Sequence, residues 1–238
     1  MAMELKLGEI EIDVVLKDIK NLHLSVYPPT GRVRISAPNR MNLESIRSFA
    51  ISKLGWIKQQ QAKLRRQERE TPREYLDRES HYVWGKRYLL TVIEEHAPPK
   101  VELMHSRLVL RISPGADDRA RKSTMDRWYR EQIRAAVPDL LAKWEPIVGV
   151  TVDGVFVQKM KTRWGSCNPL ARHIRLNTDL AKKPSECLEY IVVHELVHVL
   201  EPTHNSRFLA LMDQLMPHWR ACRQQLNQLP VPHEDWLY

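Results

Sequence analysis

The residues most able to do chemistry lie in the segment His194-Glu195-Leu196-Val197-His198. Two histidines four residues apart project from the same face of an α-helix, so their imidazoles can bind one metal ion. Glu195 follows the first histidine directly, a position from which its carboxylate can act on a water molecule at the metal. This spacing predicts a hydrolytic metal centre with His194 and His198 as ligands and Glu195 as general base.

A third ligand is expected nearby, because a catalytic zinc ion takes three protein ligands and keeps a position open for water, whose pKa it lowers to about 7. Pro202 ends the predicted helix soon enough for the chain to turn back and bring His204 to the metal. Metzincins share this histidine spacing but carry glycine where this chain has Glu201, which we therefore regard as a fallback ligand or a group behind the ligands. Zinc is the expected ion, although three histidines would also accept manganese, cobalt or nickel.

The segment 185–200 that carries these residues is apolar on nearly every side and follows Pro184, a residue suited to the first turn of a helix. A helix of this composition is expected to be buried. Isolated buried histidines are mostly hydrogen-bonded core residues. Two histidines and a carboxylate on an aliphatic helix, however, are costly to bury without a compensating partner. Their burial together therefore favours a metal site.

Periodicity in the sequence predicts the elements that would position this helix. Alternating apolar residues predict strands in the first third, and from Asn42 the spacing changes to that of a helix. The middle third repeats this order before a long amphipathic helix. The predicted segments are strands at 11–16, 22–26, 33–36, 88–93, 101–103, 108–112, 150–160 and 174–177, and helices at 42–57, 125–144 and 185–200.

A short likeness between the first and middle thirds suggests how the chain is divided. Arg32-Val33-Arg34-Ile35-Ser36 precedes the first helix, and the similar Leu110-Arg111-Ile112-Ser113 precedes the second. The likeness fits an internal duplication of a strand–strand–helix unit and fits two similar hairpins by chance equally well. Because Pro114-Gly115 stops the second set of strands, we expect a β-rich region with one long helix at 1–114 and a metal-binding catalytic domain at 115–238.

Composition restricts the partners and the compartment. The net charge is +8, from 37 basic and 29 acidic residues, which fits anionic partners and a solvated basic surface equally well. The basic stretch with Lys63, Arg65 and Arg66 is expected to be an exposed helix end, with weak nucleic-acid contact as the alternative. Three cysteines, an odd number without paired spacing, argue for a reducing compartment, and we expect the cytoplasm. No apolar run is long enough to predict a membrane span.

Residues around the metal motif resemble a known family. They are Lys161-Thr162-Arg163-Trp164-Gly165-Ser166-Cys167, Ile174-Arg175-Leu176-Asn177, and His194 to His204 followed by Asn205 and Phe208. This pattern is similar to the YgjP-like metal-dependent hydrolases, bacterial relatives of the zincin metallopeptidases and of the SprT and WLM groups. The resemblance implies an α+β fold. In it, an antiparallel strand-and-helix N-terminal half precedes a zincin-like catalytic core, a small sheet plus the HExxH helix.

The same resemblance implies roles for individual residues. His194, His198 and His204 would be the ligands and Glu195 the general base, with the Arg163–Cys167 loop beside them. Arg163 is expected to stabilise a developing oxyanion or to hold a phosphate. Gly165 would allow close backbone approach, and Cys167 is expected to be a buried structural thiol.

Three function classes follow. The leading one is a zinc metallopeptidase in which a sheet edge, either the strand entering Arg163 or the one near Ile174, holds an extended peptide. The first alternative is a nucleoside triphosphate pyrophosphatase or phosphohydrolase, with phosphates bound by Lys161, Arg163 and Arg175. The second is a nucleic-acid-associated metalloprotein, which Glu195 argues against, because a structural metal site needs no carboxylate beside its ligand.

Overall fold

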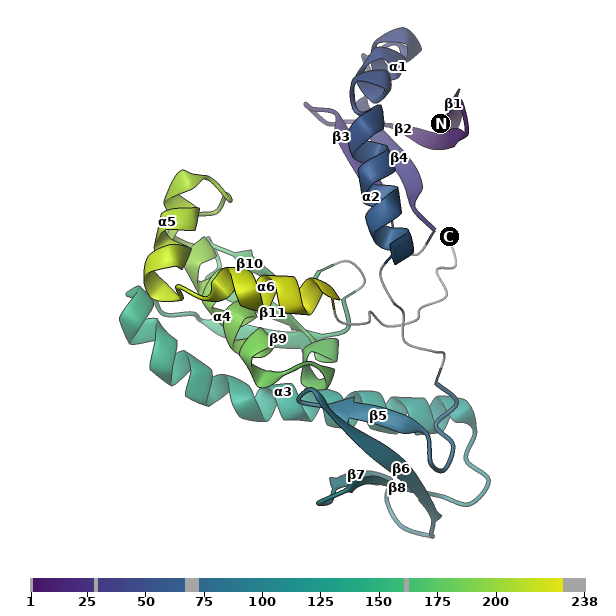
Figure 1. The fold of residues 1–238 in the computed structure, drawn as a ribbon, viewed down its shortest axis with the longest axis vertical. Coiled ribbons are helices and arrows are strands. Elements are labelled where there is room, and N and C mark those ends of the chain that lie inside the picture. Colours follow the sequence, from purple (N-terminus) through teal and green to yellow (C-terminus); the bar gives the residue numbers. More distant parts are fainter. Residues whose placement is uncertain (1, 28–29, 67–72, 161–162, 229–238) are drawn as a thin grey trace. The chain divides into compact units, whose positions relative to one another are not determined.

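The computed structural model describes residues 2–27, 30–66, 73–160 and 163–228, shown as ribbon in Figure 1. Its secondary structure confirms the predicted α+β class, because three small sheets alternate with helices. Contacts divide the chain into two compact units that meet in sequence between residues 71 and 72. Each unit is described by itself.

The first unit is a four-stranded sheet followed by two helices. Its strands are β1 (Ala2–Leu7), β2 (Ile10–Lys17), β3 (His23–Tyr27) and β4 (Arg32–Pro38), in the order β1-β2-β4-β3. The two outer pairs are antiparallel, and the central pair β2 and β4 is parallel. Alternate residues of these strands face helices α1 (Leu43–Ser52) and α2 (Leu54–Arg66). The resulting core consists of Leu5, Ile10, Ile12, Val14, Val33, Ile35, Ala37, Ile46, Ala50 and Ile57.

Two details of this unit differ from the prediction. The sequence predicted one long helix, whereas the structure has α1 and α2 separated at Lys53. Near this break the Ser52 hydroxyl donates to the carbonyl of Phe49 at 2.7 Å, a side-chain bond of the kind that competes with the helical ladder. Strand β1 was missed, although Met3, Leu5 and Leu7 alternate with polar residues.

The second unit begins with another four-stranded sheet. Strands β5 (Ser80–Val83), β6 (Lys86–Glu94), β7 (Lys100–Leu103) and β8 (Arg107–Ile112) have the order β5-β6-β8-β7. Here too the outer pairs are antiparallel and the central pair is parallel. Helix α3 (Asp118–Val148) follows, capped by the Asp117 carboxylate, which accepts from the Ala120 amide at 2.8 Å.

Helix α3 joins this sheet to the rest of the unit. It is 31 residues long and packs against β7 and β8. It also packs against β9 (Gly154–Gln158), the 3-10 helix η1 (Thr178–Lys182) and α4 (Ser185–Leu200), so one hydrophobic core runs through all of these elements. Sheet β5–β8 therefore belongs to the unit that contains the metal motif. The predicted division after residue 114 differs from this arrangement, because it would cut between β8 and the helix that covers it.

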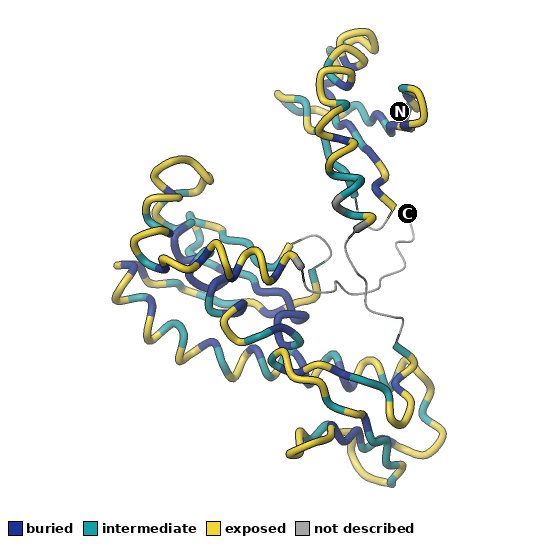
Figure 2. Tube along the Cα trace, in the orientation of Figure 1, coloured by how far each residue is buried: buried dark blue, intermediate teal, exposed yellow. Residues whose placement is uncertain are grey.

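The remaining elements surround the buried helix α4 (Ser185–Leu200). A three-stranded sheet has the order β10-β11-β9, formed by β9 (Gly154–Gln158), β10 (Gly165–Asn168) and β11 (His173–Asn177). Helix η1 (Thr178–Lys182) leads into α4, and α5 (Ser206–Leu215) and α6 (Trp219–Gln228) follow it. Figure 2 shows the burial of α4, as its composition predicted. Strand β10 was expected to be part of a loop, because its residues include Gly165 and Asn168, which are unfavourable in strands.

None of the helices within the described ranges is long and apolar enough to cross a membrane.

Candidate metal centre

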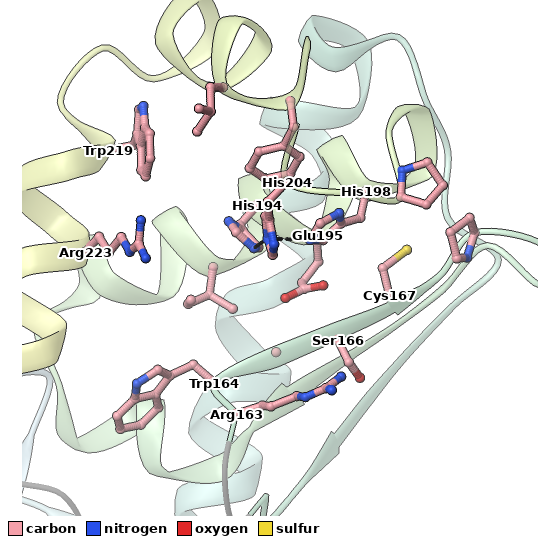
Figure 3. A pocket seen from close by; sticks show the side chains of 16 residues that line it. Arg163, Trp164, Ser166, Cys167, His194, Glu195, His198, His204, Trp219 and Arg223 are labelled. Atoms are coloured by element: carbon pink, nitrogen blue, oxygen red, sulfur yellow. Dashed lines mark hydrogen bonds between the residues drawn. The ribbon is translucent and has the colours of Figure 1, made fainter. Parts of the chain in front are cut away.

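Three histidines converge at the C-terminal end of α4. His194 and His198 lie one turn apart on the helix, and His204 returns from the loop before α5 (Figure 3). The Nε2 atom of His204 lies 3.0 Å from that of His194 and 3.1 Å from that of His198. Zn–N bonds of about 2.0–2.1 Å in tetrahedral geometry separate nitrogens by roughly 3.3 Å, so the three atoms fit around one ion. The three imidazoles form a group of side chains that could hold a metal ion.

The backbone fixes the orientation of His198. Its Nδ1 lies 3.0 Å from the carbonyl oxygen of Glu201, an arrangement in which Nδ1–H donates and Nε2 remains free to bind a metal. The Glu201 carboxylate points elsewhere, since it accepts from the hydroxyl of Thr203 at 2.9 Å and from its amide at 3.3 Å. Glu201 therefore orients a histidine through its carbonyl and shapes the turn to His204 through its side chain.

Phe208 supports all three imidazoles. Its ring centroid lies 4.9 Å from that of His194 and 4.7 Å from those of His198 and His204, and the side chain is 1% exposed. Helix α5 presents this ring because Asn205 caps the helix, accepting from the Phe208 amide at 3.0 Å. Asn205 and Phe208 thus help to position the histidines.

Burial makes His194 a neutral imidazole. Burial, followed by the neighbouring His198 and His204 and then by Arg223, lowers the pKa of His194 to about 3. An imidazole must be deprotonated to bind a metal, so this environment favours ligation near neutral pH.

Glu195 is buried beside the histidines, with 3% of its surface exposed. Burial raises the pKa of its carboxyl to about 8, against the lowering effect of Arg163. A divalent cation nearby would lower this pKa, because opposite charge favours the ionised form. The Oε2 atom has no hydrogen-bond partner within the described part of the chain. A buried carboxylate oxygen without a partner is costly, which fits a place reserved for water or substrate.

Gly165 lets β10 approach this carboxylate. A Cβ atom at Gly165 would lie 2.5 Å from Oε1 of Glu195 and 2.8 Å from Cγ2 of Ile191, both too close. The expectation that glycine allows a close backbone approach here agrees with these distances. Glycine thus brings an edge strand against the helix that carries the histidines.

A cavity of about 780 Å³ opens between these elements (Figure 3). Its walls come from β10 and the residues before it, from α4, from the His204 loop and from α5 and α6. The lining residues are Arg163, Trp164, Gly165, Ser166, Cys167, Pro169, Ile191, His194, Glu195, His198, Pro202, His204, Phe208, Leu209, Trp219 and Arg223.

The structure places the other predicted residues as follows. Arg163 is exposed and lines the cavity, whereas Lys161 and Thr162 lie outside the described residues. Cys167 also lines it and is half-buried, and burial followed by the charge of Glu195 raises the pKa of its thiol to about 11. A protonated thiol is a poor nucleophile.

His173 does not line the cavity but packs against Phe156, with ring centroids 5.2 Å apart. Arg65 is exposed, and the side chains of Lys63 and Arg66 lie outside the described part.

Sequence reasoning missed Trp219 and Arg223, the α6 residues on the cavity wall. The signal was present: Trp219, Cys222 and Leu226 have helical spacing and are buried. Arg223 is next to Cys222 within this stripe, so recognising the helix would have placed a guanidinium at the edge of its buried face.

A carboxylate beside three gathered imidazoles on the wall of a cavity is typical of metal-dependent hydrolases. Residues 20–229 match the family described as YgjP-like, metallopeptidase domain. The chain belongs to this family and is a metal-dependent hydrolase of the metallopeptidase class, as the motif residues predicted.

Among solved structures, one metallopeptidase resembles part of the chain. The crystal structure of the metallopeptidase zymogen of Pyrococcus abyssi abylysin is 23% identical, covering 38% of this chain and 90% of that one with a TM-score of 0.36. A comparison with curated proteins gives no match.

Proposed function

We propose that this metallopeptidase uses zinc, held by His194, His198 and His204, and that Glu195 is its general base. The observation that carries the proposal is the convergence of three Nε2 atoms, 3.0 and 3.1 Å apart, beside a buried carboxylate on one cavity. Three neutral nitrogen donors that leave a fourth position open are the ligand set of a catalytic zinc site. When bound, such an ion activates a water molecule and polarises the carbonyl of the scissile bond.

Glu195 would move the proton. Its carboxylate accepts a proton from the attacking water and later gives it to the leaving amine. Burial keeps bulk water away from this carboxylate, and Gly165 lets a substrate-binding strand lie next to it. Arg163, which lines the same cavity, is proposed to stabilise negative charge that develops on the substrate.

Strand β10 is the proposed site for the peptide backbone. Among the described strands it pairs with β11 alone, which leaves its other edge for a further strand, whereas β11 lies between two neighbours. Gly165, Ser166 and Cys167 of β10 line the cavity. An extended peptide that pairs with this edge would pass the histidines and Glu195. The sequence suggested instead the strand entering Arg163, which corresponds to β9, or the one near Ile174, which is β11. The proposed edge strand β10 is neither of these.

The test compares zinc-loaded wild type with Glu195→Gln and His204→Gln in a size-fractionated cell extract. Mass spectrometry of new peptide termini and the zinc content of each protein are measured together. We expect Glu195→Gln to keep zinc and to lose cleavage by at least about 100-fold. His204→Gln is expected to lose both zinc and cleavage. Full activity of Glu195→Gln would refute its role as general base.

The same extract tests the alternatives. A fall in nucleoside triphosphates with a rise in monophosphates, dependent on Glu195, would replace the peptidase by a phosphohydrolase that binds phosphate at Arg163. Salt-dependent retention of nucleic acid without any cleavage would support the nucleic-acid-associated metalloprotein.

A further inference from the structure

Two arginines on α6 lie on either side of Trp219 and have different partners. The guanidinium carbon of Arg220 lies 4.6 Å from the centroid of the indole ring, and that of Arg223 lies 5.9 Å from it. Arg220 forms a two-pronged ion pair with Asp213, in which Nη1 donates to Oδ1 and Nη2 to Oδ2. Asp213 also accepts from the Trp219 indole at 2.7 Å. The charge of Arg220 is thus neutralised outside the cavity.

Arg223 faces the cavity instead. It lines the wall opposite β10, and Figure 3 shows its side chain reaching from α6 toward His194. It shares this cavity with His194 and His204, so its guanidinium lies on the wall beside the metal centre. Within the described ranges, no carboxylate lies at ion-pair distance from it.

The charges on the cavity wall are unbalanced. Among the described residues that line it, Glu195 is the single carboxylate, while Arg163 and Arg223 are cationic. Glu195 is occupied as the proposed base, and the proposed zinc ion would add further positive charge. A substrate that brings a negative group to the α6 side would therefore be favoured.

We propose that Arg223 forms a carboxylate-binding subsite, so that the enzyme prefers peptides with a carboxylate close to the scissile bond. The planar guanidinium presents N–H donors in the fork that a carboxylate accepts with both oxygens, as Arg220 does with Asp213 one turn away. The carboxylate belongs to an acidic side chain or to the C-terminus of the peptide. This inference rests on the proposed peptidase function and names the substrate class of that site.

The test uses the zinc-loaded full chain and a peptide library prepared from a digested proteome. Half of the library is treated with acidic methanol, which converts side-chain and C-terminal carboxylates to uncharged methyl esters. Cleavage of both halves is measured by mass spectrometry for wild type, Arg223→Gln and Arg220→Gln. Arg220→Gln is the matched control, because it removes the same charge from the same helix but does not line the cavity.

We expect esterification to reduce cleavage by wild type and by Arg220→Gln by about 10- to 100-fold, the loss typical of a two-pronged charged hydrogen bond. Arg223→Gln is expected to cleave both halves at the same low rate. Arg223→Lys keeps the charge but loses the fork, so esterification should have an intermediate effect on it. If Arg223 only supported the fold, Arg223→Gln would cleave both halves more slowly but keep the same ratio of cleavage between them as wild type.

The cleavage sites identify the source of the carboxylate. A preference for Asp or Glu at a fixed distance from the cleaved bond indicates a side chain, and cleavage at a fixed distance from the peptide end indicates the C-terminus. Equal cleavage of both halves by wild type would overturn the subsite and leave the peptidase intact. Equal loss of the preference in Arg220→Gln and Arg223→Gln would also overturn it. If wild type cleaved neither half, the proposed peptidase function itself would fail.

Discussion

The sheets β1–β4 and β5–β8 share one topology but lie in different surroundings. The strand orders are β1-β2-β4-β3 and β5-β6-β8-β7. In each sheet the two central strands are parallel, and each outer strand pairs antiparallel with its central neighbour. The similar stretches 32–36 and 110–113 begin on the corresponding strands β4 and β8. Their likeness in sequence therefore extends to the sheets in which they lie.

The helices after the sheets account for the difference. Helices α1 and α2 are short and enclose a separate core with β1–β4. Helix α3 extends beyond β5–β8 and also packs against α4. Sheet β5–β8 and the metal centre therefore share one core. In addition, the Trp84 amide at the β5–β6 turn donates to the Ala181 carbonyl before α4 at 2.8 Å. The same sheet is thus a separate unit in one place and a support for the metal centre in the other.

The largest expected effect comes from comparing two fragments of the chain that begin at different residues. A fragment of residues 72–238 keeps β5–β8 on α3, and we expect it to fold and bind one zinc ion. A fragment of residues 115–238 exposes the face of α3 that β5–β8 covers, where the Tyr129 hydroxyl donates to the Tyr82 carbonyl, so we expect it to aggregate or stay unfolded. Circular dichroism, light scattering and zinc content check both. A folded, zinc-binding 115–238 would show that β5–β8 is dispensable and would support the boundary predicted from the sequence.

Metal removal is expected to affect one unit only. If zinc binds only the folded second unit and its free concentration is about 1,000 times the dissociation constant, it stabilises this unit by roughly 4 kcal/mol. That corresponds to a rise of about 10 °C in the midpoint of thermal unfolding. In scanning calorimetry, a chelator should lower the transition of residues 72–228 and leave that of residues 2–66 unchanged. His204→Gln, which lacks a ligand, should not respond to the chelator. If both transitions moved together, the two units would not be independent.

Core truncation at corresponding positions gives a smaller contrast. Ile35 in β4 is 0% exposed and Ile112 in β8 is 1% exposed. Replacing either by alanine is expected to cost about 2–5 kcal/mol. Ile112→Ala should lower the transition that responds to zinc, whereas Ile35→Ala should lower the other one and leave zinc binding unchanged. A loss of zinc affinity in Ile35→Ala would contradict the separation of the two cores.

These contrasts also show what the sequence could predict about the fold. Long periodic segments such as β2, β8, α3 and α4 were found, because their apolar spacing records the face that they bury. The boundary between the units was placed differently, because it depends on which core the far end of α3 joins, and periodicity does not contain that information. The α1–α2 break is local backbone chemistry within one continuous periodic pattern.

For the site, the sequence predicted residues whose spacing on one helix fixes their geometry. His194, Glu195 and His198 needed only the helix, and His204 needed only a short loop, so all four were placed on one cavity. Arg223 lies on a helix whose apolar spacing was present but not recognised, and no spacing rule connects that helix with the metal motif. Strand β10 was hidden because Gly165, whose missing side chain makes room for Glu195, also weakens a strand pattern.

The smallest expected effect concerns the two hairpin turns. Gly8 follows β1 with φ +62° and Gly85 follows β5 with φ +78°, so alanine at either position costs about 1–2 kcal/mol of backbone strain. A Cβ at Gly8 meets nothing within 4 Å, whereas one at Gly85 would lie 2.9 Å from Cγ of Pro184, the residue at the start of α4. Because both variants carry the same backbone strain, a difference between their effects reports the contact of Gly85 with Pro184.

We therefore expect Gly8→Ala to lower only the stability of its own unit. Gly85→Ala should lower the stability of the second unit by more, and it should reduce kcat/KM by up to about 10-fold, because a small shift of α4 misplaces Glu195 and the histidines. Calorimetry and peptide cleavage by both variants measure the difference. Unchanged kcat/KM in Gly85→Ala would mean that Pro184 yields without moving the helix. The second sheet would then support the metal centre through α3 alone.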